Sequence, residues 1–193
     1  MAMPAEVGRR WTREQVRNRI AAGPLATPRY ELVDGELLVT PSPSAQHQEA
    51  VRLLLLALGE YLSRNPVGHV VHSPADVEVV PSFITQPDVF VVPKLEWRRV
   101  LEDGLPYHHL MIAAEMLSPS SGRFDRVTKR VKYQRHVPEY WIFDLDSRLV
   151  ERWTPRDQRP EVLTDTLEWS PEQSVEPFRL ELVGFFRAVF GED

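Results

Sequence analysis

The sequence predicts one mixed α/β domain over residues 1–193. Three observations support this fold class. The chain has 193 residues, enough for a single domain with a sizeable core. Segments with the alternation of a strand are interspersed with segments that have the period of a helix. No internal repeat, low-complexity stretch or linker divides the chain, so a single layered domain is the simplest organisation.

The first half of the chain contains two predicted helices and several strands. Residues 11–23 have a helical pattern, with Thr12 as the expected N-cap. Residues 29–42 predict two short strands about an Asp34-Gly35 turn, which is a strong hairpin signal. Residues 44–64 form a clear amphipathic helix that Ser44 can cap. Residues 68–80 predict one or two strands, and residues 87–93 predict a compact one.

The second half begins with an apolar strand at residues 109–117, which we expect to be central because both of its faces are apolar. A helix is predicted from Asp125 to His136, and residues 139–155 predict a strand, a turn and a strand. Short strands near Glu161–Leu163 and Phe178–Leu182, then a last helical turn at Phe185–Phe190, complete the expected order.

Composition excludes several classes of function. The chain has no cysteine, so a disulfide, a thiol nucleophile and a Cys-ligated zinc are all excluded. The longest apolar runs, such as Leu53–Leu58, are too short to span a bilayer, and no secretory signal is visible, so we expect a cytoplasmic protein. The net charge of -5 argues against a large surface that coats nucleic acid.

Two carboxylates stand out because they lie at the ends of apolar strands. Asp88 opens the strand at residues 87–93, and Glu115 lies near the end of the run at residues 109–117. A buried and unpaired carboxylate is costly, so each needs a cation, a donor or a metal nearby. If the two converge, they offer the hard oxygen ligands that suit Mg²⁺ or Mn²⁺. Taken singly, each is more consistent with a solvated or hydrogen-bonded acid than with a metal ligand.

Five stretches of the chain resemble the Uma2 family, which is classed with restriction endonucleases. They are residues 30–47 (YELVDGELLVTPSPSAQH), Pro87-Asp88, residues 115–121 (EMLSPSS), residues 125–133 (DRVTKRVKY) and residues 137–144 (VPEYWIFD). The resemblance covers residues 29–153 and leaves residues 1–28 as an N-terminal helical extension. It implies the PD-(D/E)xK nuclease fold, in which helices flank a central mixed sheet and acidic residues lie on adjacent strands.

The resemblance also implies a set of site residues. Asp88 corresponds to the acid of the PD element and Glu115 to the acid of the (D/E)xK element, both as metal ligands. Leu117 stands where that element has its lysine, and Lys129 on the following helix matches the displaced lysine best. Glu31 resembles an acid on the N-terminal side of such sites, and His47 matches a histidine at the start of the long helix.

Alternatives remain open for each of these residues. Val127 and Val131 lie opposite Lys129 on the helix; if they face the sheet, Lys129 points to solvent and Lys132 is its rival. His47 is also consistent with a surface histidine. Glu31 and Glu36 are consistent with acids that solubilise a hairpin, and Ser118, Ser120 and Asp125 with helix caps.

The basic segment before residue 137 has a functional and a structural interpretation. It carries six cations and almost no acid, which favours contact with phosphates: Arg123, Arg126, Lys129, Arg130, Lys132 and Arg135. A charge-rich helix face is also typical of simple solvation.

The sequence is therefore consistent with three functions. The first is a Mg²⁺- or Mn²⁺-dependent endonuclease that hydrolyses DNA, as a homodimer or higher homo-oligomer if both strands are cut. The second is a catalytically inactive domain of nuclease fold that binds nucleic acid or protein. The third is a hydrolase of small phosphate esters.

Overall fold

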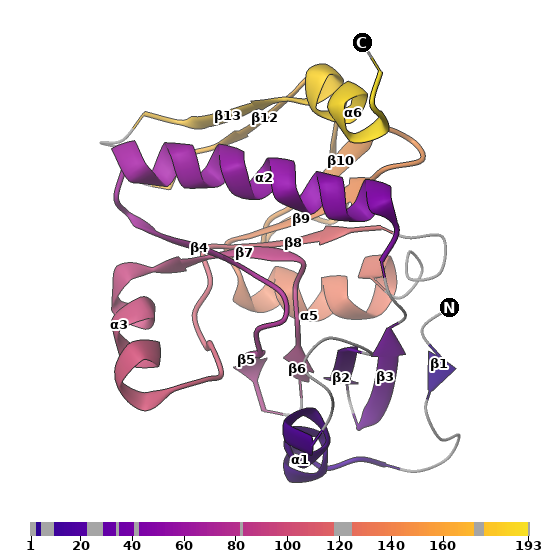
Figure 1. The fold of residues 1–193 in the computed structure, drawn as a ribbon, viewed down its shortest axis with the longest axis vertical. Helices are drawn as coiled ribbons and strands as arrows, with labels where there is room; N and C mark the ends of the chain where they lie inside the picture. The colour runs from indigo at the N-terminus through magenta and orange to yellow at the C-terminus, as the bar shows by residue number, and fades with distance from the viewer. Residues whose placement is uncertain are drawn as a thin grey trace.

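A six-stranded mixed sheet forms the centre of the protein (Figure 1). The computed structural model describes residues 3–4, 10–22, 29–33, 35–40, 43–81, 83–117, 125–171 and 176–192. In spatial order the sheet comprises β11 (Glu161–Leu163), β10 (Leu149–Trp153), β9 (Glu139–Asp144), β8 (Ile112–Met116), β7 (Val89–Pro93) and β4 (Gly68–His72). Only β8 and β9 pair in parallel, and the other neighbours in this sheet pair antiparallel.

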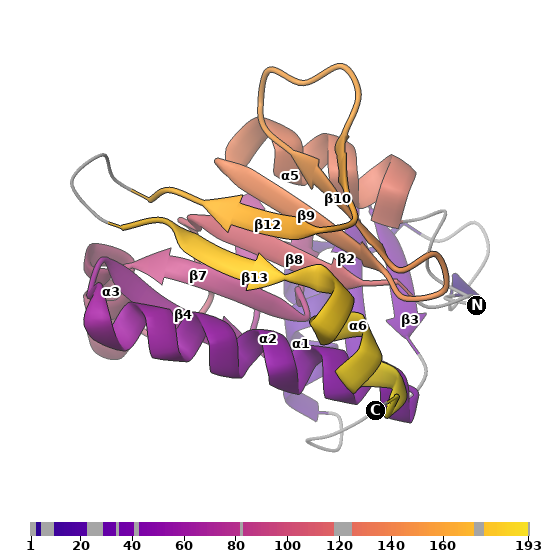
Figure 2. The ribbon, with the colours of Figure 1, turned by 90° about the horizontal axis from the view of Figure 1, so that it is seen from above.

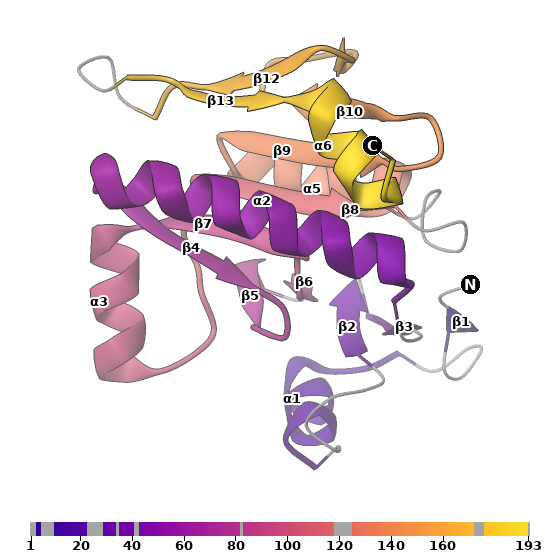
Figure 3. The same ribbon diagram turned by 45° about the horizontal axis from the view of Figure 1, so that its top comes forward.

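One face of this sheet is covered by a long helix and the C-terminal elements (Figures 2 and 3). These are α2 (Ala45–Arg64), α6 (Leu182–Phe190) and the hairpin of β12 (Thr166–Trp169) and β13 (Phe178–Glu181). Apolar side chains at helical spacing on α2, such as Leu54 and Leu58, pack against Val89 and Ala114 of the sheet. The Ser44 hydroxyl accepts from the His47 amide at 3.2 Å, which confirms the predicted cap.

The opposite face is covered by a helix that starts with a π-helical turn. The turn spans Asp125–Lys129 and continues directly into α5 (Arg130–His136), which lies below the sheet in Figure 1. Tyr133 is fully buried and stacks on Tyr140 of β9, with 4.9 Å between ring centroids. A third helix, α3 (Lys94–Asp103), lies at the β4 end of the same sheet.

A second sheet of five strands lies beside α5, on the side away from the central sheet (Figure 1). Its order is β1 (Met3–Pro4), β3 (Glu36–Thr40), β2 (Arg29–Val33), β6 (Phe83–Thr85) and β5 (Val77–Val80), and every pair in it is antiparallel. Gly35 has φ +87°, a left-handed conformation that glycine adopts without strain, so the expected hairpin turn is present. Asp34, its partner in the predicted turn, lies outside the described residues.

The helix α1 (Arg13–Ala22) packs against β2, and its predicted cap is confirmed by a 3.3 Å hydrogen bond from the Gln15 amide to the Thr12 hydroxyl. The strand at residues 109–117 was predicted to be central, and β8 is indeed an inner strand with every residue buried. Within the part of the chain that the structure describes, no helix is long and apolar enough to cross a membrane.

Candidate active site

Asp88 and Glu115 lie side by side at one end of the central sheet. Val89 of β7 pairs with Ala114 of β8, and the two strands are antiparallel. Asp88, just before Val89, therefore lies beside Glu115, just after Ala114. A hydrogen bond fixes this arrangement, because the Met116 amide donates to Asp88 Oδ2 at 2.9 Å. Both carboxylates are buried, with 3% and 4% of their surface exposed. The predicted convergence of these two acids is therefore present in the structure.

Lys129 lies between two carboxylates that come from different sheets. Its Nζ is 3.0 Å from Glu31 Oε1 and 3.1 Å from Glu115 Oε1. Glu31 is on β2 of the second sheet and Glu115 on β8 of the central sheet. The lysine itself is only 5% exposed. A cation this deeply buried is stable only when it is paired and hydrogen-bonded.

The two lysines differ in burial. Lys129 and Tyr133 lie four positions apart and are both buried, so the face they share is the one turned inward. Val127 on the opposite side is 56% exposed, so the alternative in which the valines face the sheet is wrong. Lys132 is partly exposed.

The phenol of Tyr133 closes one side of this cluster. Its hydroxyl lies 2.6 Å from the Thr85 hydroxyl. Burial raises the pKa of Tyr133 well above its ordinary value, and the nearby negative charge of Glu115 raises it further. The phenol is therefore a neutral group that holds the helix in position against β6.

His47 joins the cluster from the first turn of α2. Its Nε2 is 3.2 Å from Asp88 Oδ1, and the histidine is 6% exposed. The surface alternative for this residue is therefore wrong. Since a carboxylate only accepts, Nε2 carries the proton in this contact. The other ring nitrogen, Nδ1, is buried and has no hydrogen-bond partner among the residues that the structure describes.

The sequence analysis did not identify Gln86 and Thr85, which hold two residues of the cluster in position. The Gln86 amide donates to Glu31 Oε1 at 2.9 Å, which orients that carboxylate toward Lys129. Thr85 holds Tyr133, as described above. Thr85 could have been noticed as a polar residue close to Pro87-Asp88 in a mostly apolar stretch, whereas the backbone amide of Gln86 leaves no side-chain signal.

The other acidic candidate and the basic segment behave differently. Glu36 is exposed at the hairpin and lies outside the cluster. Arg126 pairs with Asp144 and Glu151, each at 2.6 Å, and Arg130 lies over the ring of Trp153. Asp144 of β9 and Glu151 of β10 thus supply the acid partners of Arg126, so this arginine is already paired. Ser118, Ser120, Arg123 and the Asp125 side chain lie outside the described residues.

The donor set suits a hard divalent cation that is only partly enclosed by protein. Mg²⁺ is commonly held by one or two carboxylates, and water and substrate phosphate complete its shell. Asp88 and Glu115 offer two such carboxylates. Within the described ranges, no three His, Asp or Glu side chains form a group that could hold a metal ion by themselves.

A mixed sheet with converging acids and a buried lysine from the adjacent helix agrees with the arrangement that the resemblance to the Uma2 family implies. The fold agrees with a solved structure described as "a putative nuclease belonging to DUF820 from Anabaena variabilis ATCC 29413". The TM-score is 0.69 at 16% identity, over 89% of this chain and 97% of that one.

The chain belongs to the Uma2 family, described as "Putative restriction endonuclease", which matches residues 20–182. No curated protein is significantly similar to it in sequence.

Proposed function

We propose that this protein is a metal-dependent endonuclease that hydrolyses DNA phosphodiester bonds. The observation that carries the proposal is the buried cluster of Glu31, Asp88, Glu115, Lys129 and His47 at one end of the central sheet. Strongly interacting buried charges in one place are costly for stability and are typical of functional sites. The family description, a restriction endonuclease, agrees with this chemistry.

The carboxylates of the cluster support a divalent cation. Among the side chains that the structure describes there, three carboxylates lie around one ammonium. One Mg²⁺ or Mn²⁺ would offset part of this negative charge. Asp88 and Glu115 would hold it, since they are adjacent and both end on hard oxygen atoms. When bound, such a metal lowers the pKa of a coordinated water and stabilises negative charge on the phosphate.

The side chains of the cluster would then have separate roles in hydrolysis. In the reaction a water oxygen forms a bond to phosphorus, and the bond from phosphorus to the leaving sugar oxygen breaks. Lys129 donates hydrogen bonds to the attacking water or to a phosphate oxygen, where charge develops in the transition state. Glu31 orients Lys129 and is itself oriented by the Gln86 amide. His47 orients Asp88 through Nε2.

Cleavage of plasmid DNA by the Glu115→Gln variant tests the proposal. Glutamine keeps the shape of the side chain, and Glu31 still pairs with Lys129, so the variant is expected to fold. The parent should nick or linearise the plasmid with Mg²⁺ or Mn²⁺ and not with a chelator. The variant should be slower by at least about a hundredfold. Glu60→Gln is the matched control because Glu60 is an exposed acid on α2.

Two results would contradict the proposal. Full activity in a folded Glu115→Gln variant would remove this carboxylate from the mechanism. A parent that cleaves small phosphate esters and never DNA would favour the small-ester hydrolase. Calorimetric titration of Mg²⁺ into the parent and into Asp88→Asn/Glu115→Gln, with a short duplex present, separates the two hydrolase functions from a non-catalytic module. Saturable binding that the variant loses favours a hydrolase, and absence of binding favours the module. The predicted dimer stays a prediction, and the mass in solution tests it.

A further inference from the structure

Two short links of the chain connect the two sheets beside the candidate active site (Figure 1). Residues 73–76 lead from β4 of the central sheet to β5 of the second sheet, and residues 86–88 lead from β6 back to β7. Since β4 pairs with β7 and β5 pairs with β6, the two links run side by side. They therefore influence how the acids of one sheet are placed relative to those of the other.

The link at residues 86–88 orients two acids of the cluster. At its start, the Gln86 amide donates to Glu31 Oε1 at 2.9 Å. At its end, Asp88 Oδ2 accepts from the Met116 amide at 2.9 Å. Glu31 belongs to the second sheet and Met116 to the central sheet. A displacement of this link would therefore disturb both acids at once.

Ser73 fastens this link to the one beside it. Its hydroxyl lies 2.8 Å from the carbonyl oxygen of Gln86 and 2.6 Å from that of Pro87. A hydroxyl has one hydrogen, so the two carbonyl oxygens share it. The Ser73 amide donates to the Asp88 carbonyl oxygen at 3.2 Å. Asp76 adds a further contact, because its Oδ1 accepts from Gln86 Nε2 at 2.9 Å. One serine thus contacts the carbonyl oxygens of three consecutive residues.

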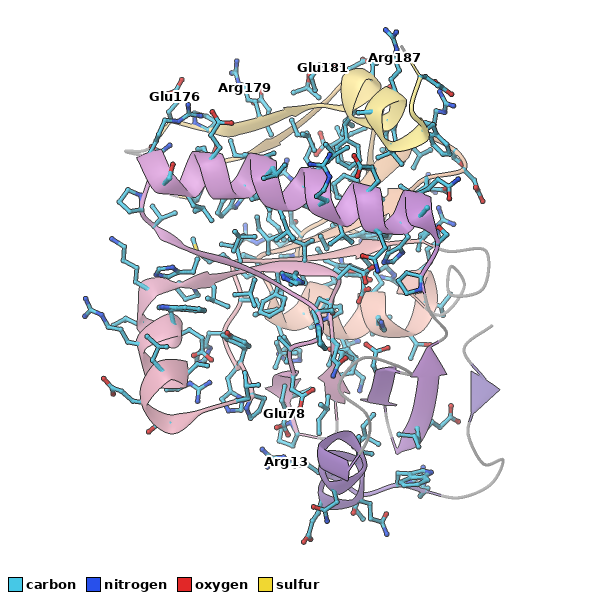
Figure 4. All side chains as sticks on the ribbon, viewed as in Figure 1. Arg13, Glu78, Glu176, Arg179, Glu181 and Arg187 are labelled. Atoms are coloured by element: carbon cyan, nitrogen blue, oxygen red, sulfur yellow. The ribbon has the colours of Figure 1, made fainter. Side chains whose placement is uncertain are left out.

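The link that carries this serine is itself anchored at its far end. The Tyr107 amide donates to the Asp76 carbonyl oxygen at 2.9 Å, and the Glu78 amide donates to the Tyr107 carbonyl oxygen at 2.8 Å. Figure 4 shows Glu78 of β5 facing Arg13 of α1, and its Oε2 lies 2.6 Å from Arg13 Nη2. The first link is therefore a fixed base to which the second is attached.

We propose that Ser73 is a positioning residue of the candidate active site. It holds the link at residues 86–88 in the one place where the Gln86 amide reaches Glu31 and the Asp88 carboxylate reaches the Met116 amide. The part that concerns metal affinity rests on the proposed function, in which Asp88 is a metal ligand. Loss of a contact that orients a metal ligand typically weakens metal binding or activity by about 10–100-fold.

Amide hydrogen exchange of the metal-free protein tests the positioning directly. Ser73→Ala should speed exchange of the Gln86 and Met116 amides by at least about fivefold, because two carbonyl oxygens of the link lose their hydroxyl donor. The reference is the Met111 amide, which donates to the Val91 carbonyl oxygen at 2.7 Å and should exchange as in the parent. Ser73→Thr keeps the hydroxyl and should restore the exchange rates of the parent.

The matched control is Ser63→Ala. The Ser63 hydroxyl also donates to a backbone carbonyl oxygen, that of Glu60 at 2.7 Å, but it is exposed on α2. Unchanged exchange of the Gln86 and Met116 amides in Ser73→Ala would overturn the proposal. Equal acceleration at Met111 would overturn it as well, because the substitution would then have lowered the stability of the whole domain.

Cleavage of plasmid DNA gives a second readout that separates this proposal from the endonuclease proposal. Ser73→Ala should need at least about tenfold more Mg²⁺ for half-maximal cleavage and should regain the rate of the parent at saturating Mg²⁺. A loss of rate that excess Mg²⁺ does not relieve would contradict the positioning of Asp88 by Ser73. A parent that does not cleave DNA would overturn the endonuclease proposal, and hydrogen exchange would then decide the role of Ser73 by itself.

Discussion

Replacing Lys129 with methionine should destabilise the protein more than any other single change in the cluster. The substitution keeps most of the length of the side chain and removes the charge that lies 3.0 and 3.1 Å from Glu31 and Glu115. Two buried carboxylates then face each other without this cation. Breaking a buried ion pair from one side costs about 3–5 kcal/mol, because the remaining charge stays desolvated. We expect a loss in this range from the free energy of unfolding.

Urea unfolding, followed by the fluorescence of the buried tryptophans, measures this loss. Lys129→Met/Glu31→Gln/Glu115→Gln should regain most of the stability, since it removes both the cation and the charges left without it. Lys94→Met is the matched control, because Lys94 is exposed at the start of α3. A Lys129→Met variant within about 0.5 kcal/mol of the parent would refute the burial of this lysine between two acids, since that range is typical of surface substitutions.

Two further predictions concern the frame of the site. Tyr133→Phe should lack an alkaline loss of stability that the parent shows: burial and Glu115 raise the pKa of the phenol, so the stability of the parent is unaffected by this group below pH of about 10 and falls as pH rises further. Urea unfolding of both proteins between neutral and alkaline pH measures this, and parallel curves would contradict it. Gly68→Ala should destabilise the protein by about 1–3 kcal/mol, since the new Cβ would lie 2.3 Å from the Val92 carbonyl oxygen. Gly59→Ala on α2, where the nearest atom to the new Cβ would be 3.9 Å away, should instead be neutral or stabilising. Urea unfolding of both glycine variants measures the difference.

Elements with a strong pattern were predictable from sequence, and elements without one were not. The helix α2 has apolar residues at helical spacing and a serine cap, and both features are present in the structure. In contrast, α3 was missed because it buries little: Leu95 and Leu101 are exposed, and its buried residue is Glu96. β6 was missed because all three of its residues are buried, so its sequence does not alternate between core-facing and solvent-facing side chains.

In the candidate site, too, features that depend on local spacing were predictable and features that depend on tertiary contacts were not. The position of Lys129 and Tyr133 on one face follows from spacing alone. Spacing does not predict which face turns inward. The valines form an apolar face on the other side of the helix, and the choice between the two faces depends on tertiary contacts. The pairing of Arg126 with Asp144 and Glu151 was likewise invisible, since those acids are 18 and 25 residues further along the chain.

The π-helical turn at Asp125–Lys129 gives a physical reason for a lysine that comes from the helix and not from the strand. The position two residues after Glu115 is Leu117, which directly follows β8 and is buried in the apolar core between the sheet and α5. A lysine there would have to reach the acids from the same strand as Glu115. On the helix, Lys129 ends the π-helical turn and approaches Glu31 and Glu115 from the side. A single π-helical turn is uncommon and occurs often at functional sites. Lys129 is therefore positioned by the start of the helix, and Tyr133 one turn later anchors that start to β6 through Thr85.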